Sequence, residues 1–197
     1  MRFFRNLAGI ITLLLLFLAP YRAAAGEPTV QLRATVDQFV RILTNTSVAE
    51  LRATGLPRMA LDLIFGRFDF SEMTKRSLGR HWADLNPGER REFVDAFTQR
   101  LLRAYGRSMR ATGDEKIEYG SENLDGEYAT VETKVMSGNG EELPVDYQMH
   151  DINGQWKVYD VVIDSISIVD NYRAQFERVI AKTSLKDLLQ KIKQQDS

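Results

Sequence analysis

Apolar residues recur at two different spacings along this chain, and the change between them divides it into helical and strand-forming parts. Up to Met109 they recur every three or four positions, as on one face of an α-helix. From Ile117 to Ile163 they recur at every second position, as on one face of a strand. Helical spacing then returns as far as Ile192. This order predicts an α+β domain with helices first, an antiparallel sheet next and helices last.

Capping and breaking residues give the expected boundaries of the helices. Side chains of Ser, Thr, Asp and Asn accept hydrogen bonds from the free amides of a first helical turn, whereas Gly and Pro interrupt a helix. Helices are therefore expected after Pro28, from Thr46 or Ser47 to Gly55, after Pro57 to about Phe65, from Ser71 to Gly79, from Asn86 to Gly113, from Ser167 to Ile180, and from Ser184 to Ile192.

The longest predicted helix carries one continuous apolar ridge. Its start is marked by Asn86, Pro87 and Glu89: a capping side chain, a proline at the first helical position and an acid that bonds back to the cap. Apolar side chains then recur every fourth residue, and we expect them to pack on the sheet. The ridge consists of Phe93, Phe97, Leu101, Tyr105 and Met109.

The strand-forming part predicts a four-stranded, curled antiparallel sheet. Its runs are separated by turns at Asp125-Gly126, Gly138 to Gly140 and Asn153-Gly154, and such short connections join only antiparallel neighbours. The last strand, from Trp156 to Ile163, is unusual because strict alternation places apolar residues on both faces. Each face then requires an apolar cover, either protein alone or protein and a ligand.

The first 25 residues predict a cleaved secretory signal. Arg2 and Arg5 precede an apolar run from Leu7 to Leu18, and the triplet from Ala23 to Ala25 forms a small-residue cleavage site. The run is shorter than the roughly 20 residues that span a bilayer, which favours cleavage over retention as an anchor.

Residues 26–197 are expected to form one exported, soluble domain. The chain contains no Cys, which excludes thiol catalysis and Cys-ligated metal. It has 26 Lys and Arg against 27 Asp and Glu. Because the leader removes only basic residues, the remaining domain is mildly acidic, and this argues against a general nucleic-acid binder.

Few residues are suited to catalysis. We interpret His81, beside Trp82, and His150, on the polar face of its strand, as structural or solvated. The chain has no Gly-rich phosphate loop, GxSxG or HExxH motif. Asp69 and Asp160 have apolar neighbours, so each is either a carboxylate of raised pKa, as in an isomerase, or a structural group. The structural reading makes Asp69 a helix cap and pairs Asp160 with an Arg or a backbone amide.

The inward residues of the sheet and of the long helix have two interpretations. If sheet and helix close tightly, these residues form ordinary core, which the spacing alone favours. If the sheet curls away, they line a cavity for an apolar ligand.

Three phrases resemble the MlaC family. They are FDFSEMTKRSLGRHW (68–82), NPGERREFVDAFTQRLLRAYGRSM (86–109) and GQWKVYDVVIDSISIVDNYRAQFERVI (154–180). The third is the most distinctive, because a WKVYDV strand leads directly into a SxVxNYRxQF helix. The resemblance covers the exported part of the chain in order, although residues 50–67 carry no family phrase.

The resemblance implies a non-enzymatic, soluble periplasmic carrier of phospholipid, also called a toluene-tolerance auxiliary protein. Such proteins serve an ABC-type lipid transport system that maintains outer-membrane lipid asymmetry in Gram-negative bacteria. An NTF2-like cone with an apolar cavity is implied, with the lipid as cargo and no cofactor. The residues expected to contact acyl chains are Leu78, Phe97, Leu101, Tyr105, Val131, Val135, Tyr147, Val158, Val161, Ile163 and Tyr172.

The same resemblance implies two membrane partners, an inner-membrane ring of MCE-domain subunits and an outer-membrane lipoprotein-porin complex. Asn171 and Arg173 are candidates for headgroup contacts or for roles at a helix surface. A hopanoid is an alternative cargo. An NTF2-like isomerase using Asp69 or Asp160, and an interaction module with a solid core, remain the alternative functions.

Overall fold

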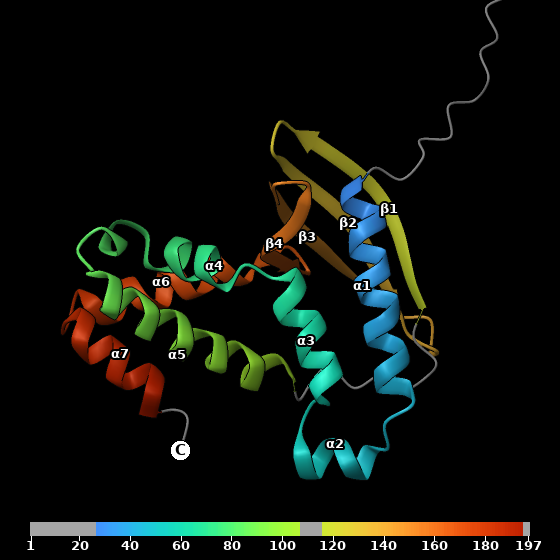
Figure 1. Ribbon diagram of the computed structural model, residues 1–197, viewed down its shortest axis with the longest axis horizontal. Coiled ribbons are helices and arrows are strands. Elements are labelled where there is room, and N and C mark those ends of the chain that lie inside the picture. Colours follow the sequence, from blue (N-terminus) through green and yellow to red (C-terminus); the bar gives the residue numbers. More distant parts are fainter. Residues whose placement is uncertain (1–26, 107–115, 195–197) are drawn as a thin grey trace, which may run out of the picture.

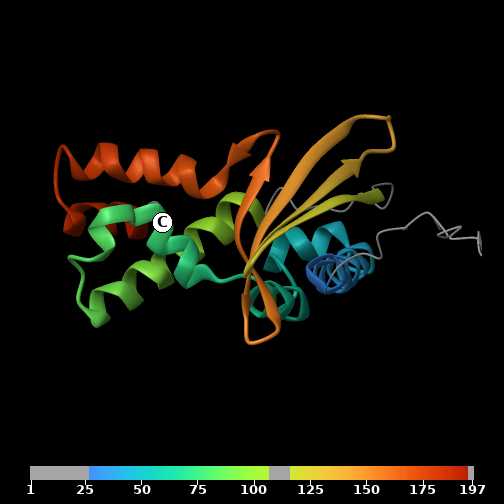
Figure 2. The same cartoon turned by 90° about the horizontal axis from the view of Figure 1, so that it is seen from above.

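The computed structural model describes residues 27–106 and 116–194. The molecule is elongated, and the helices of residues 70–106 and 168–194 gather at the end opposite the strands (Figure 1). Figure 1 shows α4, α5, α6 and α7 at one end, with the sheet at the other and α1 crossing the sheet. Figure 2 shows the twist of the sheet and places α1 and α3 beside the same face. The expected leader, residues 1–25, lies outside the described residues, as does the end of the predicted ridge at Met109.

The observed elements confirm the α+β class and the expected order. The helices are α1 (Glu27–Thr44), α2 (Val48–Thr54), α3 (Arg58–Arg67), α4 (Phe70–Leu78), a 3₁₀ turn (Gly79–Trp82), α5 (Pro87–Gly106), α6 (Ile168–Ile180) and α7 (Leu185–Gln194). The strands are β1 (Lys116–Asp125), β2 (Tyr128–Met136), β3 (Glu142–Ile152), β4 (Gln155–Ile163) and β5 (Ile166–Ser167). Within the described ranges, no helix combines the length and the hydropathy of a transmembrane segment.

Side chains at the helix starts confirm several of the expected boundaries. Asn86 Oδ1 accepts a hydrogen bond from the Glu89 amide at 3.0 Å, and Glu89 Oε2 accepts one from the Asn86 amide at 2.9 Å. Ser47 and Ser167 cap α2 and α6 through their hydroxyls. The expected cap at Ser71 is wrong. The cap lies two residues earlier, at Asp69, whose carboxylate accepts a hydrogen bond from the Glu72 amide, so helix α4 begins at Phe70.

The sheet is a meander with the strand order β1-β2-β3-β4-β5, antiparallel throughout. Four of these strands are the predicted ones. The fifth, β5, is a two-residue strand that pairs Ser167 with Val162 and Ile166 with Ile163. It turns the chain from β4 directly into α6, so the sheet and the helical end are joined without a linker.

A β-bulge in β4 explains why strict alternation placed apolar residues on both faces of this strand. Met149 of β3 lies opposite Val158, but the next residue of β3, Gln148, lies opposite Asp160, so Tyr159 is an extra residue. The extra residue shifts the alternation by one position. Strict alternation was therefore wrong for this strand. The four residues that share the inner face are Trp156, Val158, Val161 and Ile163.

Helix α1 is anchored to the sheet at its first turn. Glu122 of β1 accepts a hydrogen bond from the Thr29 amide at 2.8 Å and another from the Thr29 hydroxyl. A carboxylate at this position satisfies a free amide and complements the positive end of the helix dipole. A second bulge, between Tyr119 and Glu122, lies next to this contact.

The apolar ridge of α5 packs on helices rather than along the sheet, contrary to our expectation. The Phe97 ring contacts Tyr172 and Phe176 of α6 edge-on, with centroids 4.9 and 5.3 Å apart. Helices α4 and α7 complete its surroundings. Only the last turns of the helix, from Leu101 to Gly106, face the inner side of the sheet, across a cavity.

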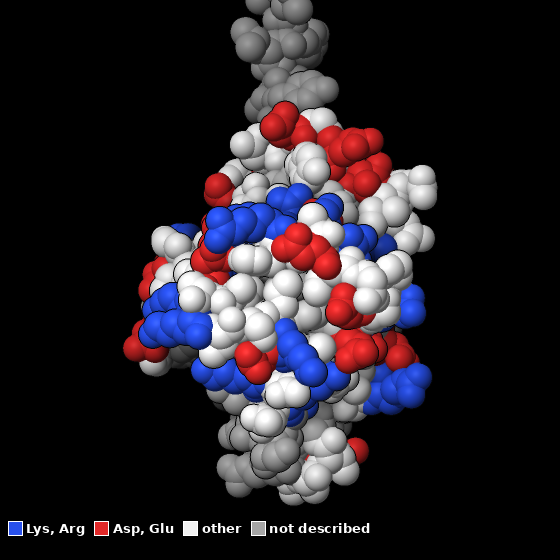
Figure 3. Space-filling view, turned by 90° about the vertical axis from the view of Figure 1, so that its left-hand side faces the viewer, with Lys and Arg blue, Asp and Glu red and all other residues white. Residues whose placement is uncertain are grey.

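The surface of the helical end carries charges of both signs. Figure 3 shows Lys and Arg side chains interspersed with Asp and Glu over this end of the molecule. Several of them form ion pairs, including Lys193 with Glu92 at 2.9 Å.

Candidate functional site

The inner face of the sheet borders two apolar cavities. The larger, about 380 Å³, lies between α1, α3 and the sheet, and its size falls in the range of small-molecule sites. Only Thr35 and Arg67 interrupt its apolar and aromatic wall. The lining residues are Leu32, Thr35, Val36, Phe39, Val40, Leu43, Leu63, Ile64, Arg67, Phe68, Tyr105, Ile117, Val135, Leu143, Tyr147 and Ile163.

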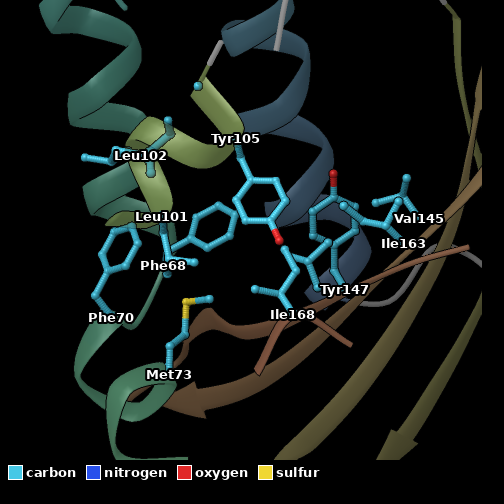
Figure 4. A pocket seen from close by; sticks show the side chains of 13 residues that line it. Phe68, Phe70, Met73, Leu101, Leu102, Tyr105, Val145, Tyr147, Ile163 and Ile168 are labelled. Atoms are coloured by element: carbon cyan, nitrogen blue, oxygen red, sulfur yellow. The ribbon is translucent and has the colours of Figure 1, made fainter. Parts of the chain in front are cut away.

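The smaller cavity, about 160 Å³, lies between α4, the end of α5 and the sheet. Figure 4 shows Tyr105 entering it from α5, with the hydroxyl pointing toward Ile168. An apolar void of about this size is large enough to hold a hydrocarbon group such as benzene. Its lining residues are Ile64, Phe68, Phe70, Met73, Leu101, Leu102, Tyr105, Gly106, Val145, Tyr147, Val161, Ile163 and Ile168.

The two cavities are lobes of one apolar region, because they share part of their walls. Five residues line both of them: Ile64, Phe68, Tyr105, Tyr147 and Ile163. Phe68 is held between the lobes by backbone pairing, since the next residue, Asp69, donates its amide to the Val158 carbonyl at 2.8 Å. Phe68, at the α3–α4 junction, therefore lies in the wall that the two lobes share.

Six of the eleven residues expected to contact acyl chains line these lobes, and the other five lie in the protein core. The lining six are Leu101, Tyr105, Val135, Tyr147, Val161 and Ile163. The core five are Leu78, Phe97, Val131, Val158 and Tyr172, each no more than 7% exposed. Spacing identifies which side chains point inward, but tertiary packing, such as that of Phe97 on Tyr172, decides which of them contact protein and which line a cavity.

The sequence pattern at several cavity residues predicts secondary structure but did not identify them as part of a cavity wall. The stripe of α1 from Val36 to Leu43 was recognised as helical, yet it forms one side of the larger lobe. Phe68 and Phe70 lie in the phrase FDF, and their rings stack with centroids 5.9 Å apart. Alternating aromatic residues at the start of a helix were the available signal for this part of the wall.

Two tyrosine hydroxyls face the apolar region. Burial raises the pKa of Tyr147 to about 12. Burial and the nearby Tyr172 raise the pKa of Tyr105 as well. Neither hydroxyl donates a hydrogen bond to another residue in the described ranges. Both groups therefore stay neutral at ordinary pH and offer donors to whatever occupies the cavity.

The two candidate acid residues have structural partners outside the cavity walls. Asp69 caps α4 through the Glu72 amide at 2.9 Å and contacts His150 Nε2 at 3.2 Å. Asp160 accepts hydrogen bonds from the amides of Val161 and Val169 and from the Ser167 hydroxyl. Burial raises its pKa although these bonds oppose the shift. The predicted helix cap at Asp69 and the predicted amide contacts of Asp160 are therefore confirmed, and neither carboxylate lines a lobe.

The remaining candidates lie on the helical end, away from both lobes. His81 contacts Glu177 at 2.8 Å and joins the 3₁₀ turn to α6. Asn171 and Arg173 are exposed on α6, where Arg173 lies 3.8 Å from Asp170. Across the described part of the chain, no cluster of three His, Asp or Glu side chains has the arrangement of a metal site.

Comparison with known proteins gives matches along nearly the whole chain. The toluene tolerance protein Ttg2D of Pseudomonas putida is 32% identical over 98 residues, which is 46% of this chain and 42% of that protein. The intermembrane phospholipid transport system binding protein MlaC of Haemophilus influenzae is 21% identical over 196 residues, covering 95% of this chain and 92% of that protein.

A solved structure and a family model extend this likeness. The phospholipid-binding protein of Ralstonia solanacearum, solved in complex with a phospholipid, superposes with a TM-score of 0.76 at 24% identity. The superposition covers 86% of this chain and 96% of that one, so the two proteins share a fold. The model of the MlaC protein family matches residues 33–194, which include every residue that lines the two lobes except Leu32. This chain belongs to the MlaC family.

Proposed function

We propose that this protein is a periplasmic phospholipid carrier that shuttles lipid between membrane complexes. The observation that carries the proposal is the pair of adjoining apolar lobes between the sheet and helices α1, α3, α4 and α5. A soluble shuttle must cover the acyl chains of its cargo, because each methylene group that leaves water contributes about 0.8 kcal/mol. Two lobes with a common wall suit a lipid with two chains.

The family relatives support the same reading. One bears the name of a phospholipid transport binding protein, and another was solved with a phospholipid bound. In this proposal residues 1–25 direct export and are removed, and the lipid is cargo rather than cofactor. An inner-membrane MCE-domain ring and an outer-membrane lipoprotein-porin complex would exchange lipid with the protein.

Native mass spectrometry tests the proposal directly. The chain, expressed with its own leader and purified gently from a bacterial periplasm, is expected to carry a stoichiometric lipid adduct. Solvent extraction then identifies the class of lipid, which separates a phospholipid from a hopanoid. An apoprotein mass that persists after incubation with phospholipid vesicles would contradict the proposal and favour an interaction module.

A pair of matched variants on α1 assigns the adduct to the cavity. Val36→Trp fills part of the larger lobe and should reduce lipid occupancy severalfold. Val30→Trp makes the same substitution on the same helix at a position 55% exposed and outside the lining, so its occupancy should match that of the unmodified protein. Equal occupancy in both variants would place the lipid elsewhere.

A further inference from the structure

Arg67 brings a positive charge into the wall of the larger lobe without a compensating acid. It is the last residue of α3 and is half-buried. Its Nε donates to the Thr35 hydroxyl at 2.9 Å, and Nη1 donates to Gln31 Oε1 at 3.0 Å and to the Trp156 carbonyl. All three acceptors are neutral, and no carboxylate in the described ranges forms an ion pair with this guanidinium.

The three neutral contacts hold the guanidinium in one orientation. They come from α1 and β4, so the side chain connects the helix and the strand that flank the lobe. The remaining terminal nitrogen, Nη2, donates to no group in the described part of the chain. An oriented guanidinium with free N–H groups is preorganised to bind an anionic oxygen.

The apolar surroundings make this arrangement costly unless an anion completes it. Burial lowers the pKa of Arg67, which reflects the loss of water around its charge. The neighbouring wall contributes side chains such as Leu32, Val36 and Phe68, which provide no acceptor. A bound anion would pair with the half-buried guanidinium in place of the missing carboxylate.

We propose that Arg67 binds the anionic oxygen of the lipid that occupies the larger lobe. Nη2 donates to that oxygen, while Thr35, Gln31 and the Trp156 carbonyl keep the guanidinium in position. The inference rests on the proposed carrier function and adds a selective contact to it. Both a phosphodiester headgroup and a fatty-acid carboxylate supply such an oxygen, and separate ligands distinguish them.

Competition between lipids with identical acyl chains tests this contact. Delipidated protein is incubated with an equimolar mixture of phosphatidylglycerol and diacylglycerol, and native mass spectrometry measures the bound ratio. A hydrogen bond to a charged group corresponds to a preference of about tenfold or more for the anionic lipid. Arg67→Met should abolish the preference while diacylglycerol still binds. Arg58→Met removes the same charge from an exposed position on α3 and should leave the ratio unchanged.

Each outcome has a defined meaning. Equal binding of both lipids by the unmodified protein, or a preference that survives Arg67→Met, overturns the proposal. Loss of both lipids in Arg67→Met assigns the residue a structural role. Arg67→Gln retains a donor for the neutral acceptors, and the ratio of the two lipids that it binds is measured in the same competition. If oleate competes as well as phosphatidylglycerol and loses this ability in Arg67→Met, the anion is a carboxylate. An unmodified protein that binds no diacyl lipid refutes the carrier function instead.

Discussion

Phe97 of α5 meets Tyr172 of α6 edge-on, with ring centroids 4.9 Å apart and planes inclined at 78°. This contact fixes the point up to which α5 belongs to the helical core. Beyond it the same ridge continues to Leu101 and Tyr105, which face the cavity. One apolar stripe therefore serves two purposes, first packing and then cavity lining.

The division of this ridge predicts different consequences for its members. Phe97→Ala should lower the free energy of unfolding by about 3–5 kcal/mol, because it leaves a void in a fully buried site. The folded fraction should retain its lipid. Urea denaturation measures the first effect and native mass spectrometry the second. A stable Phe97→Ala protein that has lost its lipid would show that Phe97 contacts the cargo.

A charge in the cavity wall should prevent lipid binding in a pH-dependent way. Leu101 is 5% exposed, so the carboxylate of Leu101→Glu would lie in apolar surroundings that raise its pKa. Co-purified lipid should be absent near neutral pH and partly restored on reloading at about pH 5, where the group is protonated. Ala104→Glu is the control, because residue 104 is exposed on the same helix. Lipid retained by Leu101→Glu at neutral pH would contradict the assignment of this wall.

The buried carboxyl of Asp160 predicts the direction of a pH dependence of stability. Burial raises its pKa in the folded protein above the ordinary value of 3.8, so folding favours the protonated form. This contribution to stability is complete below pH 3.8 and is lost as the pH rises through the folded pKa. Asp160→Asn should remove that part of the slope in denaturation curves measured between about pH 3 and pH 7. Asp164→Asn, at an exposed position, is the control. An unchanged slope in Asp160→Asn would argue against the shift.

The bulge in β4 predicts an asymmetry between insertion and substitution. Inserting one alanine after Tyr159 shifts the alternation by a further position, and Trp156 and Val158 would then turn away from the face that Val161 and Ile163 share. We expect no cooperative unfolding transition for the insertion. Tyr159→Ala keeps the register and removes contacts with Arg76 and His150, so it should cost about 1–2 kcal/mol and still unfold cooperatively. Circular dichroism during thermal unfolding distinguishes the two.

The local features of this fold could be predicted from the sequence because their causes are local. A cap such as Asn86 and Glu89 involves residues three positions apart, and the turn at Asp125-Gly126 requires only its own backbone. The meander followed from the shortness of such turns. The error at Ser71 was small, since Asp69 lies two residues away and has the same capping chemistry.

The cavity could not be predicted from the sequence in the same way, because it depends on contacts that the spacing of apolar residues does not reveal. Counting every second residue cannot detect an extra one such as Tyr159, so the face of Trp156 was misassigned. Likewise, Phe97 and Leu101 look equivalent along the ridge, and only the presence of α6 separates them. Arg67 lies in the segment that carried no recognisable phrase. Its contacts join residues 32, 36 and 89 positions apart in the sequence.

For the proposed lipid carrier, the common wall of the two lobes has a consequence for the stoichiometry of lipid binding. Tyr105 and Tyr147 border both lobes, so a chain that fills one lobe also packs against side chains that line the other. Once the first chain of a two-chain lipid is bound, the second is held beside its lobe at a high effective concentration. A lysolipid leaves one lobe empty, and two separate single-chain molecules each lose their translational freedom. The geometry therefore favours binding of one lipid with two linked acyl chains over binding of two single-chain lipids.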